Sequence, residues 1–354
     1  DKLGMSKGEL GIALLFSAIG ALFSLPFGKM LVSKLGEGKL ALIGTVLNTL
    51  AITLNFVAGS FYFLCFSLFL WGVFGSFLQI GINSVVSSME KEEDISIMSS
   101  CHGFFSLGGI IASGIGTMLM ILIGNPLLHI LIMVSIVILL QVVFASSYLK
   151  LNKERKHIEH GSHFSFKGLK KPIIWGLAIV AVSVMVSEGA IADWSALYLR
   201  DVALTGNNLV GLGYAGFSVT MTLGRFLGDY FSRRFGAWQI IVSGLLISLA
   251  GFFLVLTAHP IVTITGFLFI GLGFSVIVPE VYRLSTNIEG VDPSSGIAFM
   301  AGAGYFGFLA GPVSLGAIAE KSGLRISFMV LSLLIVFGTV VASLIRRAYR
   351  LKSV

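Results

Sequence analysis

The sequence predicts an all-α membrane protein, because 56% of its 354 residues are hydrophobic, only 12% are charged and 43 are glycine. A hydrocarbon core roughly 30 Å thick requires about 20 apolar residues per helix. Strands of a membrane barrel would alternate polar and apolar residues, whereas these apolar runs are continuous. Eleven runs are predicted to span the membrane: 9–32, 39–59, 61–88, 95–123, 126–149, 173–199, 206–232, 236–258, 260–288, 294–320 and 323–347.

An internal repeat predicts two similar halves. Such repeats within membrane-spanning sequence are typical of transporters. The second half has six apolar runs and the first has five, so we expect the first helix of the fold to be missing from this chain, just before residue 1. The predicted domains are an N-terminal bundle (1–149), a linker (150–172) and a C-terminal bundle (173–354). Marks that recur after 200 residues are Gly11, Gly28, Lys34 and Gly36, matched by Gly211, Gly228, Arg234 and Gly236.

Lys and Arg collect on one side of the predicted membrane, where 17 of them lie against five on the other. Cytoplasmic loops carry this excess, so the first side, which includes the linker, is predicted to be cytoplasmic. The net charge of +7 then reflects orientation and not nucleic-acid binding. His157, His160 and His163 lie in the linker near Glu159 and are interpreted as part of a solvated loop, with a metal site as the less favoured alternative.

Several motifs resemble the major facilitator superfamily. Leu223–Gly236 (LGRFLGDYFSRRFG) resembles the superfamily's signature between the second and third helices of each half. Glu188–Asp201, His102–Gly108 and Gly304–Pro312 resemble its bacterial YbjJ-like branch, near the fucose permeases. The resemblance covers nearly the whole chain. It implies a major facilitator fold of two six-helix bundles, eleven helices of which are present here.

The resemblance also implies location and mechanism. We expect an inner-membrane protein of bacteria whose full-length chain has both termini in the cytoplasm and whose central cavity opens alternately to each side. The first and fourth helices of each half would line the cavity, which here means 61–88, 173–199 and 260–288.

The signature residues Arg225, Asp229 and Arg233 recur every four positions and form a predicted ridge at the cytoplasmic end of their helix. We expect Asp229 to receive the N-terminus of a neighbouring helix and to hold the outward-open state. In the first-half copy, Lys29 stands where Asp229 stands in the second. The sequence therefore predicts an asymmetric gate, with a degraded latch in the first half.

Glu188 is the main candidate for proton coupling and also a candidate for contact with the solute. It lies 15 residues into its predicted helix, about 22 Å from the cytoplasmic end. A charge at that depth costs several kcal/mol and is usually kept for a function. The alternative is a carboxyl permanently satisfied by a neighbouring helix. Further along, Trp194 is a cavity candidate or an interface anchor, and Asp193 is a candidate for the extracellular gate, with a structural role favoured.

Glu280, Arg283 and Asn287 share one face of 260–288, and Pro279 is expected to kink that helix. This stripe is suited to an anionic or hydroxylated solute, or to a cytoplasmic gate with Asp229, and the gate is the favoured interpretation.

Uncharged polar residues supply the remaining candidates. Ser76, Gln79 and Asn83 form a stripe on a predicted cavity helix, either for a polar solute or for contacts between helices. His102 is the second candidate for proton coupling, although a satisfied helix contact is the more common role of a lone histidine. Tyr305 is a cavity candidate, with packing against glycine favoured.

No enzyme motif accompanies these residues. The chain lacks HExxH, GxSxG and the Walker A lysine motif, so no enzyme activity, metal or cofactor is predicted. We expect a secondary active transporter of a small polar organic solute, working by alternating access with proton coupling, as a monomer in the lipid bilayer and without nucleic-acid partners. The alternatives are a drug or metabolite efflux antiporter and, in another class, a non-transporting receptor or scaffold.

Overall fold

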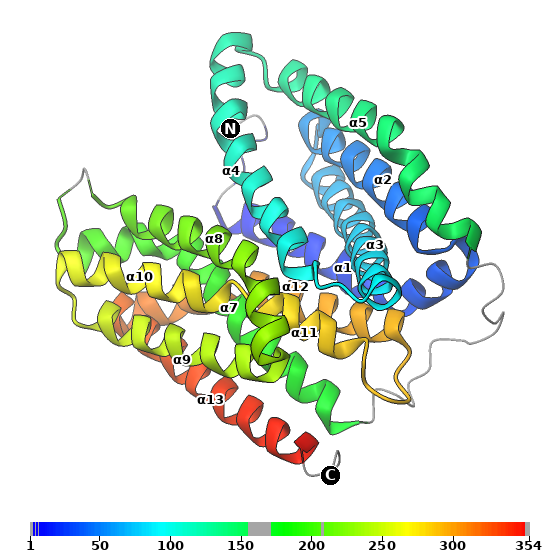
Figure 1. The fold of residues 1–354 in the computed structure, drawn as a ribbon. Coiled ribbons are helices and arrows are strands. Elements are labelled where there is room, and N and C mark those ends of the chain that lie inside the picture. The colour runs from blue at the N-terminus through cyan, green and yellow to red at the C-terminus, as the bar shows by residue number, and fades with distance from the viewer. Residues whose placement is uncertain (1–2, 4, 6, 155–170, 207–208, 351–354) are drawn as a thin grey trace. The chain divides into compact units, whose positions relative to one another are not determined.

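The computed structural model describes residues 3, 5, 7–154, 171–206 and 209–350, and every element in these ranges is a helix (Figure 1). The predicted all-α class is confirmed. Helices form along the apolar runs because a helix satisfies its own backbone hydrogen bonds, which lipid cannot do. The elements are α1 (Lys7–Leu35), α2 (Glu37–Val57), α3 (Phe61–Glu93), α4 (Met98–Ile123), α5 (Pro126–Glu154), α7 (Pro172–Asp201), α8 (Leu212–Phe235), α9 (Ala237–Leu256), α10 (Pro260–Phe274), α11 (Ile277–Ser285), α12 (Pro293–Ser322) and α13 (Leu324–Arg350).

Eight stretches among the described residues are long and apolar enough to cross a membrane. They are α1, α2, α3, α5, α7, α9, α13 and the combined α10 and α11. The predicted count of eleven is therefore not confirmed, although a helix lies in each of the eleven predicted runs. α8 is less hydrophobic than its neighbours, because glycine, hydroxyl residues and the charged Arg225 and Asp229 replace aliphatic side chains.

The predicted helix over 260–288 is interrupted. α10 ends at Phe274, a turn occupies residues 275–276, and α11 begins at Ile277. Pro279 explains the position of the break, since proline lacks an amide hydrogen and its ring collides with the carbonyl four residues earlier, at Ser275. α11 consequently forms a short separate helix at the end of this span, with Glu280 buried inside.

The sequence repeat is visible in the backbone. Gly36 separates α1 from α2 with a φ of +83°, and Gly236 separates α8 from α9 with a φ of +82°. This left-handed region of φ is open to glycine and strained for residues with a Cβ. The matched glycines therefore produce the same sharp junction in both halves.

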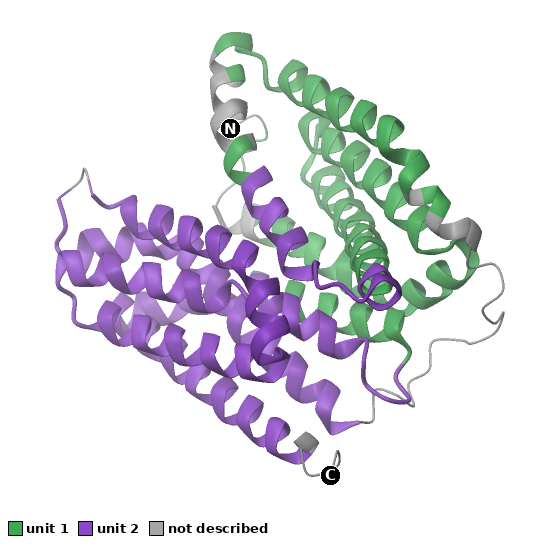
Figure 2. Cartoon of the chain, in the orientation of Figure 1, with its two compact units in different colours: residues 1–88, 109–166, 292–305 green, residues 89–108, 167–291, 306–354 purple. Residues whose placement is uncertain are grey.

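Two compact units are built from discontinuous segments (Figure 2). Unit 1 comprises residues 1–88, 109–166 and 292–305, and unit 2 comprises 89–108, 167–291 and 306–354. α4 thus begins in unit 2 and ends in unit 1, and α12 does the reverse. The predicted division into bundles at 149 and 172 stays a prediction.

In unit 1, the start of α12 packs on α1 and α3. Ala298 forms a core cluster with Leu40 and Ile80, and Leu25 of α1 packs against that cluster. A methyl group built on Gly302 would lie only 2.3 Å from a methyl carbon of Leu25, so the two helices approach closely there. Small residues at a helix contact permit this approach.

In unit 2, glycines bring helices together in the same way. Cβ atoms built on Gly251 and Gly266 would each lie 2.6 Å from the carbonyl oxygen of the other residue, which brings α9 and α10 into backbone contact. Gly213 packs against Leu199 and Phe267. Glycine therefore serves packing at these positions, as in other membrane helices.

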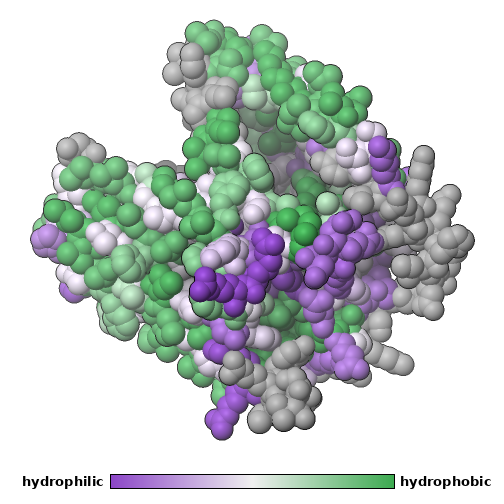
Figure 3. All heavy atoms as spheres, in the orientation of Figure 1, coloured by the Kyte–Doolittle hydropathy of each residue, from purple (hydrophilic) through white to green (hydrophobic). Residues whose placement is uncertain are grey.

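Large parts of the surface are apolar. Figure 3 shows broad hydrophobic areas on this face beside a patch of hydrophilic residues. On α5, for example, Leu139, Val142 and Phe144 are all exposed. Exposed aliphatic and aromatic side chains of this density suit contact with lipid.

Candidate functional site

Four backbone amides at the amino end of α4 have no partner inside the helix. The first four N–H groups of a helix have no partner inside it. The first hydrogen bond within α4 runs from the amide of Cys101 to the carbonyl of Ile97, at 2.9 Å. The four amides that need acceptors from elsewhere are therefore those of residues 97–100.

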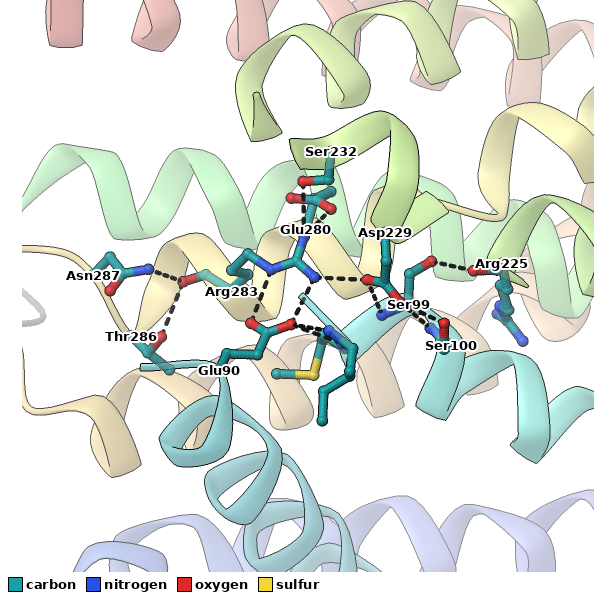
Figure 4. A network of polar contacts seen from close by, with 12 residues as sticks. Glu90, Ser99, Ser100, Arg225, Asp229, Ser232, Glu280, Arg283, Thr286 and Asn287 are labelled. Atoms are coloured by element: carbon teal, nitrogen blue, oxygen red, sulfur yellow. Dashed lines mark hydrogen bonds and ion pairs between the residues drawn. The ribbon is translucent and has the colours of Figure 1, made fainter. Parts of the chain in front are cut away.

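Glu90 and Asp229 supply the acceptors (Figure 4). Oε1 of Glu90 accepts hydrogen bonds from the first two amides, both at 2.7 Å. Asp229 accepts from the third amide through Oδ1 at 3.0 Å and from the fourth through Oδ2 at 2.7 Å. Carboxylates at a helix N-terminus also interact favourably with the helix dipole. All four amides of α4 are thereby satisfied by charged acceptors within unit 2.

Arg283 of α11 connects the two carboxylates. Its Nη2 donates to Oε1 of Glu90 and to Oδ1 of Asp229, both at 2.8 Å, and its Nε donates to Oε2 of Glu90 at 2.9 Å. Its Nη1 donates to the hydroxyl of Ser232 at 2.8 Å and to Glu280. We call these five residues the Arg283 cluster. Figure 4 shows the guanidinium at their centre.

The Arg283 cluster is almost closed to solvent. The side chain of Arg283 is 12% exposed, and those of Glu90, Asp229 and Glu280 are 8%, 5% and 0% exposed. One guanidinium therefore contacts three buried carboxylates, two of which also face the partial positive charge at the start of α4. Breaking a buried charge pair by removing one partner is strongly destabilising, because the other charge stays buried.

A second polar group lies one helical turn before Asp229. The hydroxyl of Ser99 donates to the backbone carbonyl of Arg225 at 2.7 Å, and the Arg225 guanidinium donates to Ser106. Nη2 of Arg225 also lies 3.9 Å from Oε1 of Glu188 on α7. α4, α7 and α8 thus converge on Arg225 within unit 2.

The pair of Glu188 and Arg225 is incompletely hydrogen-bonded. Oε2 of Glu188 and Nε of Arg225 are buried and have no hydrogen-bond partner among the described residues. The contact between the two side chains, 3.9 Å from Oε1 of Glu188 to Nη2 of Arg225, is an ion pair that is too long for a hydrogen bond. Buried polar atoms normally find a partner, so each exception needs a physical reason.

His102 lies beside the same group. Its ring stacks on Tyr282 of α11, with centroids 5.8 Å apart and planes inclined by 30°. Its backbone carbonyl accepts a hydrogen bond from the hydroxyl of Ser106, and that hydroxyl accepts a hydrogen bond from Arg225. The buried Nε2 of His102 has no partner within the part of the chain that the structure describes. The two candidates for proton coupling are therefore both in unit 2 and both linked to Arg225 or its partner Ser106.

The polar stripe of α3 belongs to unit 1. The amide of Asn83 donates to the backbone carbonyl and to the side-chain oxygen of Gln79, at 2.8 and 3.1 Å. The buried hydroxyl of Ser76 has no hydrogen-bond partner among the described residues. A methyl group built on Gly75 would lie 3.3 Å from the hydroxyl oxygen of Tyr305, so this phenol reaches the same stretch of α3.

The other predicted residues lie outside these groups. Asp193 is exposed on α7, and Trp194 packs against Gly316 of α12. Arg233 is exposed on α8, and its neighbour Ser232 enters the Arg283 cluster instead. The exposed side-chain amide of Asn287 donates a hydrogen bond to the backbone carbonyl of Arg283 at the end of α11.

Metal ligands do not gather in the described part of the chain, where no group of three or more His, Cys, Asp or Glu residues could hold an ion. The linker histidines lie outside the described residues.

The family follows from comparison with known proteins. The sequence profile of the Major Facilitator Superfamily matches residues 1–288 of this chain. The chain belongs to the major facilitator superfamily. Superfamily membership makes it a membrane transporter of small-molecule solutes and not an enzyme. Its placement in the YbjJ-like branch rests on the motifs alone.

Relatives and solved structures agree with this assignment. An uncharacterized MFS-type transporter of Yersinia pestis is 29% identical over 345 residues, which are 97% of this chain and 87% of the relative. The multi-drug resistance efflux pump PmrA of Streptococcus pneumoniae is 25% identical over an alignment that covers 96% of this chain and 87% of the pump. The FucP transporter in its outward conformation is similar in fold, with a TM-score of 0.76 over 96% of this chain and 90% of FucP at 16% identity.

The superfamily signature identified Arg225 and Asp229, but sequence reasoning missed Glu90, Ser99, Ser100 and Ser106. Glu90 had a detectable signal, since it opens an acidic run just before the first polar residues of α4. Acidic residues are common just before helix N-termini. The serines had no such signal, because their role depends on the position of α8 beside α4.

Proposed function

We propose that this transporter couples solute movement to protons and that Glu188 binds the coupled proton. The solute is a small polar organic molecule, carried by alternating access across the inner membrane of a bacterium. The observation that carries the proposal is the buried Oε2 of Glu188, which has no partner among the described residues although the carboxyl lies within a predicted membrane helix.

The contact with Arg225 supports reversible protonation. At 3.9 Å the guanidinium is close enough to stabilise an ionised carboxylate but forms no direct hydrogen bond with it. Arg225 also donates a hydrogen bond to Ser106, which does not involve Glu188. Loss of the Glu188 charge therefore leaves the guanidinium with a polar partner, which lowers the cost of protonating the carboxyl.

The absence of accessible surface at Oε2 favours a proton over a bulkier ligand. This oxygen has essentially no solvent-accessible area. A proton needs no additional volume at this oxygen, whereas a solute could contact only the 19% of the Glu188 side chain that is exposed. His102, with its unpartnered Nε2 in the same unit, is the second proton-binding candidate.

The α3 stripe supports an uncharged polar solute. Ser76, Gln79, Asn83 and Tyr305 offer hydroxyl and amide groups without a formal charge. Such groups suit sugars, polyols and related metabolites. We keep Trp194 as a further contact and treat Arg225, Asp229, Glu280 and Arg283 as gate residues.

The direction of transport has two candidate answers. FucP is described as a fucose:proton symporter, and PmrA as a multi-drug resistance efflux pump. We favour symport because the polar groups of α3 suit a hydrophilic solute. The efflux antiporter is the second candidate, supported by the likeness to PmrA over 96% of this chain.

The test uses purified protein in liposomes and a solute selected from sugars, polyols, amino acids and organic acids by ligand-induced thermal stabilisation. We expect Glu188→Gln to reduce solute accumulation driven by a pH gradient by at least about tenfold, a coupling free energy of ~1.4 kcal/mol. Exchange of labelled for unlabelled solute should persist, since it needs no net proton movement. Glu320→Gln, the same substitution at an exposed carboxyl on α12, is the matched control and should accumulate solute normally.

A pH-sensitive dye inside the liposomes separates the alternatives. External solute should acidify the lumen in symport and make it more alkaline in antiport. Unchanged accumulation by Glu188→Gln would contradict the proton assignment alone. Absence of saturable flux in the unaltered protein, with every solute that stabilises it, would instead favour a receptor or scaffold.

A further inference from the structure

Lys29 is buried on α1, at the repeat position that Asp229 occupies on α8. Its Nζ lies 3.4 Å from Oδ2 of Asp292, and the Lys29 side chain is only 7% exposed. Both residues belong to unit 1. The predicted degraded latch therefore contains an ion pair in which the lysine is buried and the Asp292 side chain is 33% exposed.

Asp292 also holds the start of α12. It directly precedes Pro293, the first residue of that helix, and its Oδ1 accepts hydrogen bonds from the amide and the hydroxyl of Ser295, at 3.0 and 3.3 Å. Asp at the N-cap followed by Pro at the first helical position is a strong helix start. One oxygen of Asp292 thus caps α12 while the other faces Lys29.

The contacts between α1 and α12 run in an ordered series. Lys29 meets Asp292, Gly28 faces Ala298, and Gly302 contacts Leu25. Positions along α1 fall as positions along α12 rise, so the helices are antiparallel where they touch.

Unit 2 contains the corresponding series between α8 and the start of α4. Asp229 holds the α4 start, a methyl group built on Gly228 would lie 2.2 Å from Oγ of Ser99, and Arg225 donates to Ser106 further along. Gly28 and Gly228 occupy the same repeat position, as do Lys29 and Asp229. The two contacts match in position and direction but differ in the side chains that carry charge.

We propose that Lys29 and Asp292 form a charge-reversed counterpart of the Asp229 contact and position α12 in unit 1. In unit 2 the acid projects from α8 onto backbone amides of α4. In unit 1 the acid belongs to the start of α12, and α1 supplies the cation. Because Asp292 is itself at the start of α12, a carboxylate still lies at the helix N-terminus, where the helix dipole favours it.

The positioning has a functional target. Tyr305 lies further along α12, within unit 1, and its hydroxyl approaches α3 at Gly75, next to Ser76. A shift of the α12 start along α1 would move this phenol relative to the α3 stripe. Lys29 is therefore a positioning residue for the polar groups to which we assign solute contact, and this last step rests on the proposed function.

Amide hydrogen exchange at residues 294–297 in the purified full-length protein tests the pair without a known solute. We expect Lys29→Glu to accelerate exchange there by at least about tenfold, because two acids then face each other beside α12. Adding Asp292→Ser should restore slow exchange, since serine can cap the helix and the new carboxylate on α1 can face its amides, as Asp229 does at α4. Lys29→Arg should behave like the unaltered protein.

Two controls keep the rescue specific. Lys34→Glu changes an exposed lysine near the same end of α1 and should leave exchange unchanged. Lys29→Met with Asp292→Ser removes both charges, and its amides at residues 294–297 should exchange faster than those of Lys29→Glu with Asp292→Ser. If Lys29→Glu alone fails to fold, recovery of folded protein by Asp292→Ser supports the pairing.

The proposal is overturned if amide exchange in Lys29→Glu is as slow as in the unaltered protein. It is also overturned if exchange in Lys29→Glu with Asp292→Ser is no slower than in Lys29→Met with Asp292→Ser. Because these readouts involve neither solute nor proton flux, they are independent of the Glu188 experiment. Loss of coupling at Glu188 with an unchanged α12, or the reverse, would separate the two proposals.

Discussion

Arg283 is the residue on which the buried charges of unit 2 depend most directly. It bonds Glu90, Asp229 and Glu280, and two of these carboxylates come from other helices, α3 and α8. Its removal would leave three acids in a nearly closed space, and two of them also hold the start of α4.

We predict that Arg283→Ala lowers the free energy of unfolding by about 3–5 kcal/mol, the usual cost of leaving buried charges unpaired. Thermal unfolding of the purified protein measures this change. Arg233→Ala removes an exposed arginine of α8 and should leave the melting temperature unaltered. Equal melting temperatures for the two variants would show that the cluster contributes little to stability.

Individual residues are partly predictable from the sequence. The spacing of Arg225 and Asp229 and the depth of Glu188 in its apolar run are visible there. The same spacing includes Arg233 in the ridge, but burial divides that ridge: Arg225 and Asp229 are buried and Arg233 is exposed. Glu90 has a weaker signal, the acidic run that it opens, because its role depends on accepting hydrogen bonds from amides at the start of α4, seven and eight residues later.

At the scale of helices, α8 and α4 are matched by shape as well as by charge. The Cβ of an alanine at position 228 would lie 2.2 Å from Oγ of Ser99 and 2.9 Å from side-chain atoms of Ser99 and Val276. Real Cβ atoms do not approach that closely, so one helix would have to move.

We predict that Gly228→Ala destabilises the protein by about 1–3 kcal/mol, the usual range for overpacking. In an open helical position the same change should stabilise by up to about 1 kcal/mol, because alanine is the better helix former. Gly108→Ala provides that control, since no described atom lies within 4 Å of its added Cβ. Thermal unfolding of both variants is the measurement, and a stabilised Gly228→Ala would contradict the close contact.

Helix existence is easier to predict than helix continuity. Every predicted apolar run contains a helix, because length and hydrophobicity suffice to specify one in lipid. Between α10 and α11 the sequence predicts only a kink at Pro279. The structure breaks the helix at residues 275–276 because the proline ring acts on the preceding turn. α8 shows that low hydropathy does not exclude a helix. Its polar residues lower its hydropathy, yet it forms a continuous helix within unit 2.

For the whole molecule, orientation in the membrane is the property that the sequence predicts and that can be tested directly. The excess of Lys and Arg places the start of α2, with Lys39, on the cytoplasmic side and the start of α3, with Tyr62, on the opposite side. Lys39 is exposed at the start of α2, and Tyr62 is 83% exposed at the start of α3.

We predict that a cysteine at Tyr62 reacts with a membrane-impermeant maleimide in intact cells, and that a cysteine at Lys39 reacts only after the membrane is permeabilised. The native Cys65 and Cys101 are replaced by serine in both variants. Mass spectrometry or gel shift measures the labelling. The reverse pattern would invert the predicted topology and exchange the sides assigned to every loop.

The superfamily and its fold are predictable from the whole sequence, since the signature around Asp229 and the repeat extend over most of it. The composition of the compact units is not predictable. An apolar run does not encode which other helix it will touch, so nothing in the sequence indicates that residues 89–108 belong with the second half or 292–305 with the first.

That exchange of segments bears on how the chain is assembled during synthesis. Unit 1 contains residues 292–305, which leave the ribosome after most of unit 2 has been made. Until then, Lys29 has no Asp292 to neutralise it, and the α1 surface that later receives Gly302 is uncovered. Unit 1 can therefore be completed only late in translation, and a chain that stopped at the linker would retain a lysine whose partner had never been synthesised.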